Sequence, residues 1–131
     1  LVVRYLDTKT DKLSGIQGYL CSQQLSTFEV LAGSVYGLAE DQEGPDDYIK
    51  CTSSGCRGGS IGFEKPAHLY SANELNGVIY FSGSIGRKGA IWKSADGGNS
   101  WRETLNAAAS DSSDFTRIHD VGGPYKGQLY A

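Results

Sequence analysis

The sequence contains no methionine, no apolar run of the roughly 20 residues that a transmembrane helix needs, and no excess of basic residues. Its formal net charge is −3. Proteins that bind nucleic acids usually carry a basic stripe, so neither a nucleic-acid partner nor insertion into a membrane is expected. There are only two histidines, and Cys21 lies 30 positions before Cys51, which is poor spacing for zinc ligands. No metal or other cofactor is therefore predicted.

Glycine and tyrosine are abundant instead. The 131 residues include 18 glycines and eight tyrosines, a composition typical of many short strands joined by tight turns. The length corresponds to about one domain. These features predict an all-β fold with a single domain over residues 1–131.

Cysteine is scarce, and two of the three cysteines are close together. Cys51 and Cys56 bracket the polar stretch Thr-Ser-Ser-Gly, a turn that brings two adjacent strands within bridging distance. We therefore predict a disulfide between them and an extracellular or cell-surface location. Cys21 is left over, and three reduced thiols in a cytosolic protein remain the alternative.

The most informative segment reads AIWKSADGGNSWRETL, a polar glycine turn between two strand-like runs. Ser94 and Asp96 are suited to hydrogen-bonding the turn amides, Gly98 to a positive φ, and Trp101 to folding back over the turn. These four positions fill the pattern Ser-x-Asp-x-Gly-x-x-Trp. The segment resembles the Asp-box, also called the BNR repeat.

Asp-box hairpins occur in propeller sialidases and other glycosidases, in sortilin-type receptors and in related β-propeller proteins. The resemblance implies Asp-box β-hairpins in blade-like antiparallel sheets, belonging either to a β-propeller or to a β-repeat module completed by assembly. In propeller sialidases the Asp-boxes lie away from the catalytic face. The resemblance thus implies a structural role for Asp96, as a turn stabiliser rather than a catalytic acid.

A repeated pattern lies behind this motif. The sequence Gly-x-aliphatic-Tyr begins at Gly33, Gly77 and Gly127, and each copy is interpreted as a turn glycine leading into a strand. Ser94 lies fourteen positions after Tyr80, and Lys50, at the edge of the Cys51 turn, lies fourteen positions after Tyr36. The predicted repeats are a degenerate copy at 1–32, two copies at 33–76 and 77–126, and the start of another at 127–131. VVRYL and GYL are strand candidates in the first, and further blades or other copies of the chain are candidate partners.

Enzymatic alternatives depend on residues outside the motif. A sialidase carries an arginine triad and a tyrosine nucleophile, but Arg117 lacks the Arg-Ile-Pro context because His119 follows Ile118. Small microbial ribonucleases also carry Asp-box-like hairpins, and Glu64, Arg87 and His119 occur in the order of a base, a phosphate ligand and an acid. The acidic run at 40–47 is interpreted as a solvated loop rather than a calcium site.

Candidate ligand-binding residues are Trp92, Arg87 and Tyr70. Strand alternation places Trp92 with Ser94 on one sheet face and Ile91 with Lys93 on the other. Trp92 is either an exposed platform for a ligand or a core residue. The sequence favours a non-catalytic extracellular or surface module that recognises a carbohydrate or a protein partner. A fragment of a sialidase-like propeller glycoside hydrolase is the alternative, and a small secreted ribonuclease is a remote one.

Overall fold

The computed structural model describes residues 2–20, 25–39, 46–62, 67–85, 88–106 and 122–130. All regular elements in these ranges are β-strands, which confirms the predicted all-β class. The strand candidates VVRYL and GYL fall within the first two strands. The twelve strands are β1 (Val2–Asp7), β2 (Lys12–Leu20), β3 (Leu25–Leu31), β4 (Ser34–Ala39), β5 (Tyr48–Thr52), β6 (Gly55–Gly59), β7 (Ala67–Leu75), β8 (Val78–Ile85), β9 (Lys88–Ser94), β10 (Arg102–Asn106), β11 (Gly122–Tyr125) and β12 (Gln128–Tyr130).

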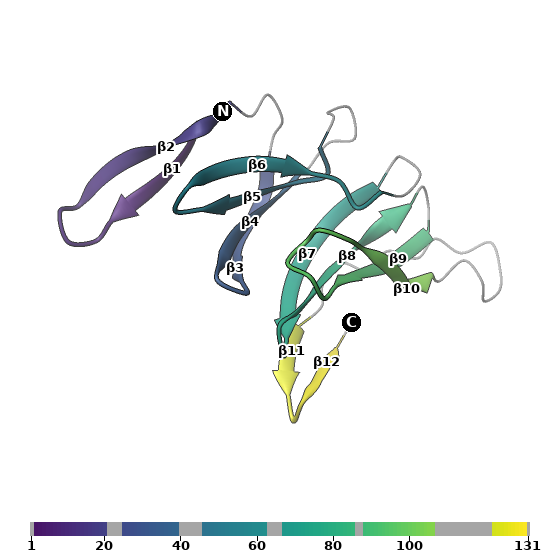
Figure 1. The fold of residues 1–131 in the computed structure, drawn as a ribbon. Coiled ribbons are helices and arrows are strands. Elements are labelled where there is room, and N and C mark those ends of the chain that lie inside the picture. Colours follow the sequence, from purple (N-terminus) through teal and green to yellow (C-terminus); the bar gives the residue numbers. More distant parts are fainter. Residues whose placement is uncertain are drawn as a thin grey trace.

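These strands form four antiparallel sheets (Figure 1). Two are four-stranded: the first sheet has the order β3-β4-β5-β6, and the second has the order β7-β8-β9-β10. Each is therefore a meander, in which every strand pairs with its neighbour in the sequence. The other two are the hairpins β1-β2 and β11-β12.

The same tight turn joins the first two strands of both four-stranded sheets and of the last hairpin. Both turn residues have positive φ in each case, as a two-residue type I′ hairpin turn requires. The pairs are Ala32 with Gly33, Asn76 with Gly77, and Lys126 with Gly127. The three Gly-x-aliphatic-Tyr sequences thus each begin the second strand of a hairpin, β4, β8 or β12.

The main hydrophobic core lies between the first and second sheets. Alternate side chains of β4 and β8, including Tyr36 and Phe81, are completely buried there together with Trp92 of β9. Aromatic rings meet edge to face across the two sheets: the Phe81 ring centroid lies 6.0 Å from that of Tyr36 and 5.3 Å from that of Tyr48. This geometry is the one that aromatic quadrupoles favour, so the two sheets are packed face to face.

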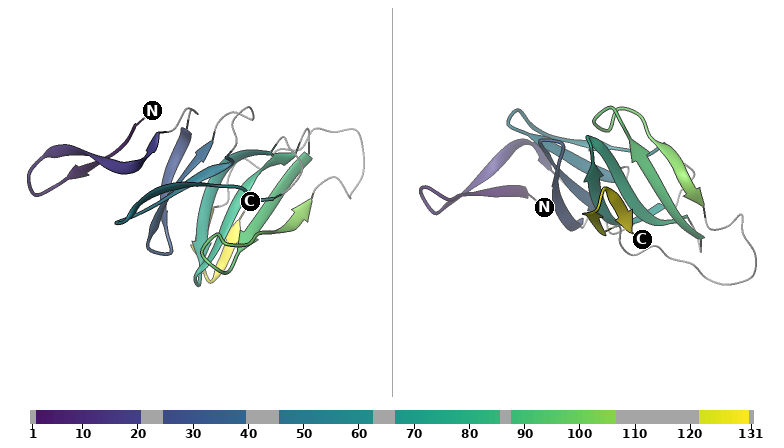
Figure 2. Two further views of the ribbon diagram at one scale, coloured as in Figure 1. Left: turned by 45° about the horizontal axis from the view of Figure 1, so that its top comes forward. Right: turned by 90° about the horizontal axis from the view of Figure 1, so that it is seen from below.

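Further contacts follow the order of the chain. A smaller cluster of Ile49, Cys51 and Cys56 occupies the other face of the first sheet, and β2 contacts β6. The first strands of successive sheets also meet, β3 against β7 and β7 against β11. The hairpin β1-β2, the first sheet and the second sheet consequently lie one after another in space, and the hairpin β11-β12 lies beside β7 (Figure 2).

Candidate functional site

The turn at 94–101 joins β9 to β10 and is organised around the carboxylate of Asp96. Ser94 Oγ donates a hydrogen bond to Asp96 Oδ1 at 2.7 Å, and the Ser100 amide donates to the same oxygen at 2.9 Å. Ser100 Oγ donates to the second oxygen, Oδ2. The Gly98 amide donates to Ser94 Oγ at 2.8 Å, and Gly97 and Gly98 both have positive φ. Residues of the predicted motif are thus linked in one hydrogen-bonded turn.

These bonds change the acidity of Asp96. The Ser100 side chain and amide, followed by the Ser94 hydroxyl, hold the pKa of the Asp96 carboxyl down to about 2 although the side chain is exposed. Hydrogen bonds that favour the charged form of a carboxyl always act in this direction. At neutral pH Asp96 has no proton to give, and its oxygens are occupied by the turn. It is a structural group and not a general acid.

Trp101 closes the turn against the core. Its ring stacks on Phe81 of the second sheet with centroids 4.3 Å apart, and meets Tyr48 of the first sheet edge to face at 5.6 Å. Its indole Nε1 donates a hydrogen bond to the Tyr48 hydroxyl at 3.2 Å. The indole therefore joins the turn of the second sheet to β5 of the first.

The glycine carbonyls of the turn are bound by three side chains of the first sheet. The Tyr36 hydroxyl and the Lys50 ammonium both donate to Gly97 O, at 3.1 and 2.6 Å, and the Tyr48 hydroxyl donates to Gly98 O at 3.0 Å. Burial, with a smaller contribution from neighbouring Tyr48, raises the pKa of Tyr36 to about 12. Tyr36 thus remains a neutral donor over the physiological range.

The sequence did not identify Tyr36, Tyr48 and Lys50 as site residues. Tyr36 was visible as the tyrosine of a Gly-x-aliphatic-Tyr copy, but its partner, Gly97, lies 61 positions away in the sequence. A period in the sequence indicates that two sheets are similar, and it does not indicate how they pack. The contact could have been predicted only from the pairing of Tyr36 with Lys50 on adjacent strands, and that pairing depends on strand register.

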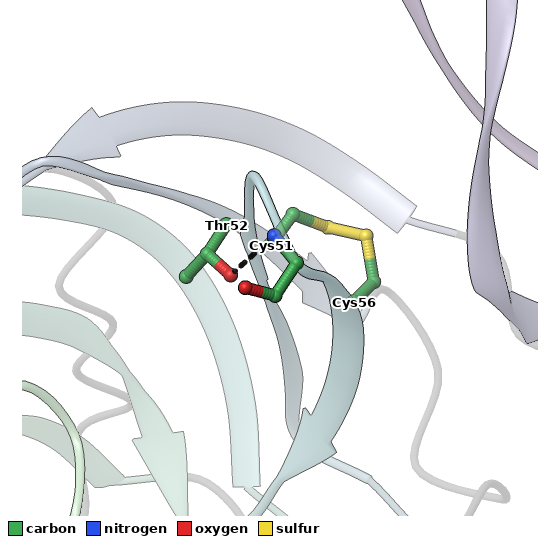
Figure 3. The surroundings of a disulfide bond; sticks show 4 residues. Cys51, Thr52 and Cys56 are labelled. Atoms are coloured by element: carbon green, nitrogen blue, oxygen red, sulfur yellow. Dashed lines mark hydrogen bonds between the residues drawn. A yellow bond between two sulfur atoms is a disulfide. The ribbon is translucent and has the colours of Figure 1, made fainter.

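The turn between β5 and β6 holds the predicted disulfide, which the structure confirms (Figure 3). Cys51 and Cys56 are directly opposite each other on the two strands, with Cα atoms 4.0 Å apart. Within the turn the Ser54 amide donates to Thr52 Oγ1 at 3.2 Å. This turn occupies the same place in the first sheet, between its third and fourth strands, as the 94–101 turn does in the second.

The predicted ligand-binding residues have different surroundings. Trp92 is completely buried between the sheets, because strand alternation directs it to the core together with Ser94, and a buried ring offers no face to a ligand. The interpretation of Trp92 as an exposed platform is corrected accordingly. Tyr70 lies on β7, partly exposed, with the His68 ring stacked on it at 6.0 Å. Arg87 lies outside the described residues.

Other candidate groups are only partly within the described ranges. Glu64, His119, Arg117 and Cys21 lie outside them, as does most of the acidic run. Asp47, at the end of that run, is buried and accepts hydrogen bonds from Ser60 Oγ at 2.8 Å and from the Ile61 amide at 2.9 Å. It serves to fix the start of β5 to the chain that leaves β6.

A depression of about 400 Å³ opens beside the 94–101 turn. Two of its lining side chains, Lys93 and Arg102, are cationic. It is lined by Val78, Lys93, Ala95, Ser100, Trp101 and Arg102. Cationic side chains favour a hydrogen-bond acceptor, and no carboxylate is among the described residues that line the depression.

Comparisons of this chain with protein-family models, with curated proteins and with solved structures find no match. In the ranges that the structure describes, no three histidine, cysteine, aspartate or glutamate side chains are grouped as metal ligands. No helix in those ranges has the length and hydropathy to cross a membrane. Functional inference therefore depends on the geometry of the turns and the sheet faces.

Proposed function

We propose that this chain is part of an Asp-box β-propeller scaffold and acts as a non-catalytic binding module. The observation that carries the proposal is the docking of the 94–101 turn onto the first sheet. Two meanders of the same strand order pack face to face, and the turn between the third and fourth strands of one is held by the other. Radial repetition of four-stranded meanders is how propeller blades are built.

Contacts between the first strands of successive units support a blade arrangement. β3 contacts β7, and β7 contacts β11, so the first strand of each unit meets the first strand of the next. Side-chain bonds reinforce both steps: the Ala32 amide donates to Glu74 Oε2 at 2.6 Å, and Asn73 Nδ2 donates to Gly123 O at 3.2 Å. The hairpin β11-β12 would then supply the first two strands of a third blade.

Asp96 itself is assigned a structural role and not a catalytic one. Its carboxylate is saturated by the turn, and its lowered pKa opposes proton transfer at neutral pH. The Cys51 disulfide supports an oxidising compartment, hence an extracellular or cell-surface location.

We assign ligand binding to aromatic side chains on the first strands of the units, β3, β7 and β11. Each of these strands carries an aromatic side chain that is partly or largely exposed: Phe28 on β3, Tyr70 on β7 and Tyr125 on β11. Phe28 is 46% and Tyr125 61% exposed. Aromatic rings provide large contact areas that suit sugar faces and protein surfaces. The ligand class is a carbohydrate or a protein partner that contacts these rings.

A glycan array probed with the full chain tests the proposal, with hydrolysis of a fluorogenic sialoside measured in parallel. We expect saturable binding to a glycan that Phe28→Ala weakens at least about fivefold, because losing one ring contact removes about 1 kcal/mol. Ser53→Ala, at an exposed position on the distant β5-β6 turn, should bind normally. Sialoside turnover that disappears when an arginine or tyrosine is substituted would instead establish the glycoside hydrolase alternative and overturn the proposal.

A further inference from the structure

Two of the side chains that hold the 94–101 turn, Tyr36 and Lys50, belong to a row of three residues across the first sheet. Tyr36 on β4 pairs with Lys50 on β5, and Lys50 pairs with Arg57 on β6. We call this row the first rung. Tyr36 and Lys50 both donate to the carbonyl of Gly97, and the Lys50 ammonium lies 5.8 Å from the centroid of the Tyr36 ring.

The second sheet carries a row with the same composition. Tyr80 on β8 pairs with Lys93 on β9, and Lys93 pairs with Arg102 on β10. We call this row the second rung. Tyr80 is the third residue after Gly77, as Tyr36 is the third after Gly33. The two rungs therefore lie on corresponding strands of their sheets, the second to the fourth, and their tyrosines lie at the same distance from the type I′ turn.

The second rung faces away from the first sheet. Ile79 and Phe81, the neighbours of Tyr80, are buried in the core between the sheets, as is Trp92, which precedes Lys93. Ser94, which follows Lys93, is also buried. Since side chains alternate along a strand, Tyr80 and Lys93 project from the opposite face. Both are partly exposed, and among the described residues neither side chain makes a hydrogen bond or ion pair. The depression lined by Lys93 and Arg102 opens at this rung.

We propose that the second rung is the docking seat for the turn between the third and fourth strands of another four-stranded unit. The occupant is a glycine turn of Asp-box type that presents a main-chain carbonyl to Tyr80 and Lys93, as Gly97 presents one to Tyr36 and Lys50. This inference rests on the proposed scaffold. The position of β11-β12 supports it, because β11 is bound to β7 and these two strands are placed as the inner pair of such a unit.

The surroundings of the second rung differ from those of the first rung in one pair of residues. Ser82 and Ile91 are paired on β8 and β9, where the first sheet has Leu38 paired with Tyr48. The second seat therefore has no equivalent of the Tyr48 hydroxyl, which binds Gly98 O and receives the bond from Trp101 Nε1. A turn docked there keeps the bonds to its first glycine carbonyl and loses the bond to its second, so Lys93 carries a larger share of the interaction than Lys50 does.

The test supplies the outer pair of strands as a peptide. A fluorescently labelled peptide with the sequence of residues 88–106 contains a third strand, the turn and a fourth strand, and can add to β12 while its turn meets the second rung. We expect saturable binding to the full chain that Lys93→Met weakens about tenfold or more, since a charge-assisted hydrogen bond is lost. Lys12→Met removes the same charge from an exposed position on β2 and should not change binding.

Folding of both variants is verified by their thermal unfolding, which Lys93→Met should leave unchanged because no described group is bonded to Lys93. A peptide with Ser94→Ala and Asp96→Ala should bind more weakly, because its turn is not organised. Equal binding to wild type and Lys93→Met, or no binding up to about 1 mM peptide, overturns the proposal. Perturbation of Lys93 by N-acetylneuraminate and not by the peptide overturns it too, since the rung would then be an anion site. None of these outcomes depends on glycan binding at Phe28. A failure of turn docking at the second rung can therefore be distinguished from a failure of the proposed ligand binding.

Discussion

Asp96 is an exposed carboxylate that accepts three hydrogen bonds from its own turn and so stabilises the turn. These bonds lower its pKa from 3.8 to about 2. A carboxyl whose pKa is lower in the folded state stabilises the fold above its unfolded pKa, and this stabilisation is lost as the pH falls through the folded pKa. The acid sensitivity of the 94–101 turn should therefore be centred between pH 4 and pH 2.

Asp96→Asn tests this assignment. The variant should melt at a lower temperature than the wild type at pH 6, and the difference should shrink as the pH is lowered from 4 to 2, because only the wild type has the Asp96 charge to lose in this range. Thermal unfolding followed by circular dichroism across this range measures the difference. A gap that stays constant with pH would mean that the Asp96 charge contributes nothing to the turn.

Tyr36 and Tyr80 are a matched pair of residues in equivalent positions, and only Tyr36 donates to a described carbonyl. Tyr36→Phe should lower the free energy of unfolding by about 1 kcal/mol, the usual net value of such a bond, whereas Tyr80→Phe should stay within about 0.5 kcal/mol of the wild type. Urea unfolding of the isolated chain measures both. Equal destabilisation by the two substitutions would contradict the assignment of the Tyr36 bond.

At the level of secondary-structure elements, the β5-β6 and β9-β10 hairpins occupy the same place in their sheets and are stabilised differently. A disulfide fixes the first, and a network of side-chain to main-chain hydrogen bonds fixes the second. The sequence predicted both turns, because their residues are local: two cysteines five positions apart, and serine, aspartate, glycine and tryptophan within eight positions. Local chemistry of this kind is what a sequence reveals best.

Removing the disulfide should cost about 2 kcal/mol, the loop-closure value for so short a loop. We expect Cys51→Ala with Cys56→Ala to lower the urea midpoint of the chain accordingly. Reductant should lower the wild-type midpoint to a similar extent and leave the double variant unchanged. Reductant that has no effect on the wild type would contradict a stabilising disulfide.

For the whole molecule, the sequence predicted strands and turns better than it predicted their packing. The all-β class and the glycine turns at Gly33, Gly77 and Gly127 follow from composition and local pattern. The contact of Lys50 with Gly97 does not, because it joins residues 47 positions apart through the register of two sheets. Trp92 illustrates the same limit: alternation gave its sheet face correctly, while its complete burial depends on the neighbouring sheet.

The packing of the two sheets around the turn is the central claim, and the scaffold and its docking seat both depend on it. Trp101 reports on it, since its ring lies between Phe81 of its own sheet and Tyr48 of the other, with a centroid 5.6 Å from that of Tyr48. Nuclear Overhauser effects from the Trp101 indole protons in the isolated chain measure this contact most directly. The structure predicts cross-peaks to the ring protons of both Phe81 and Tyr48, and cross-peaks to Phe81 without any to Tyr48 would contradict it.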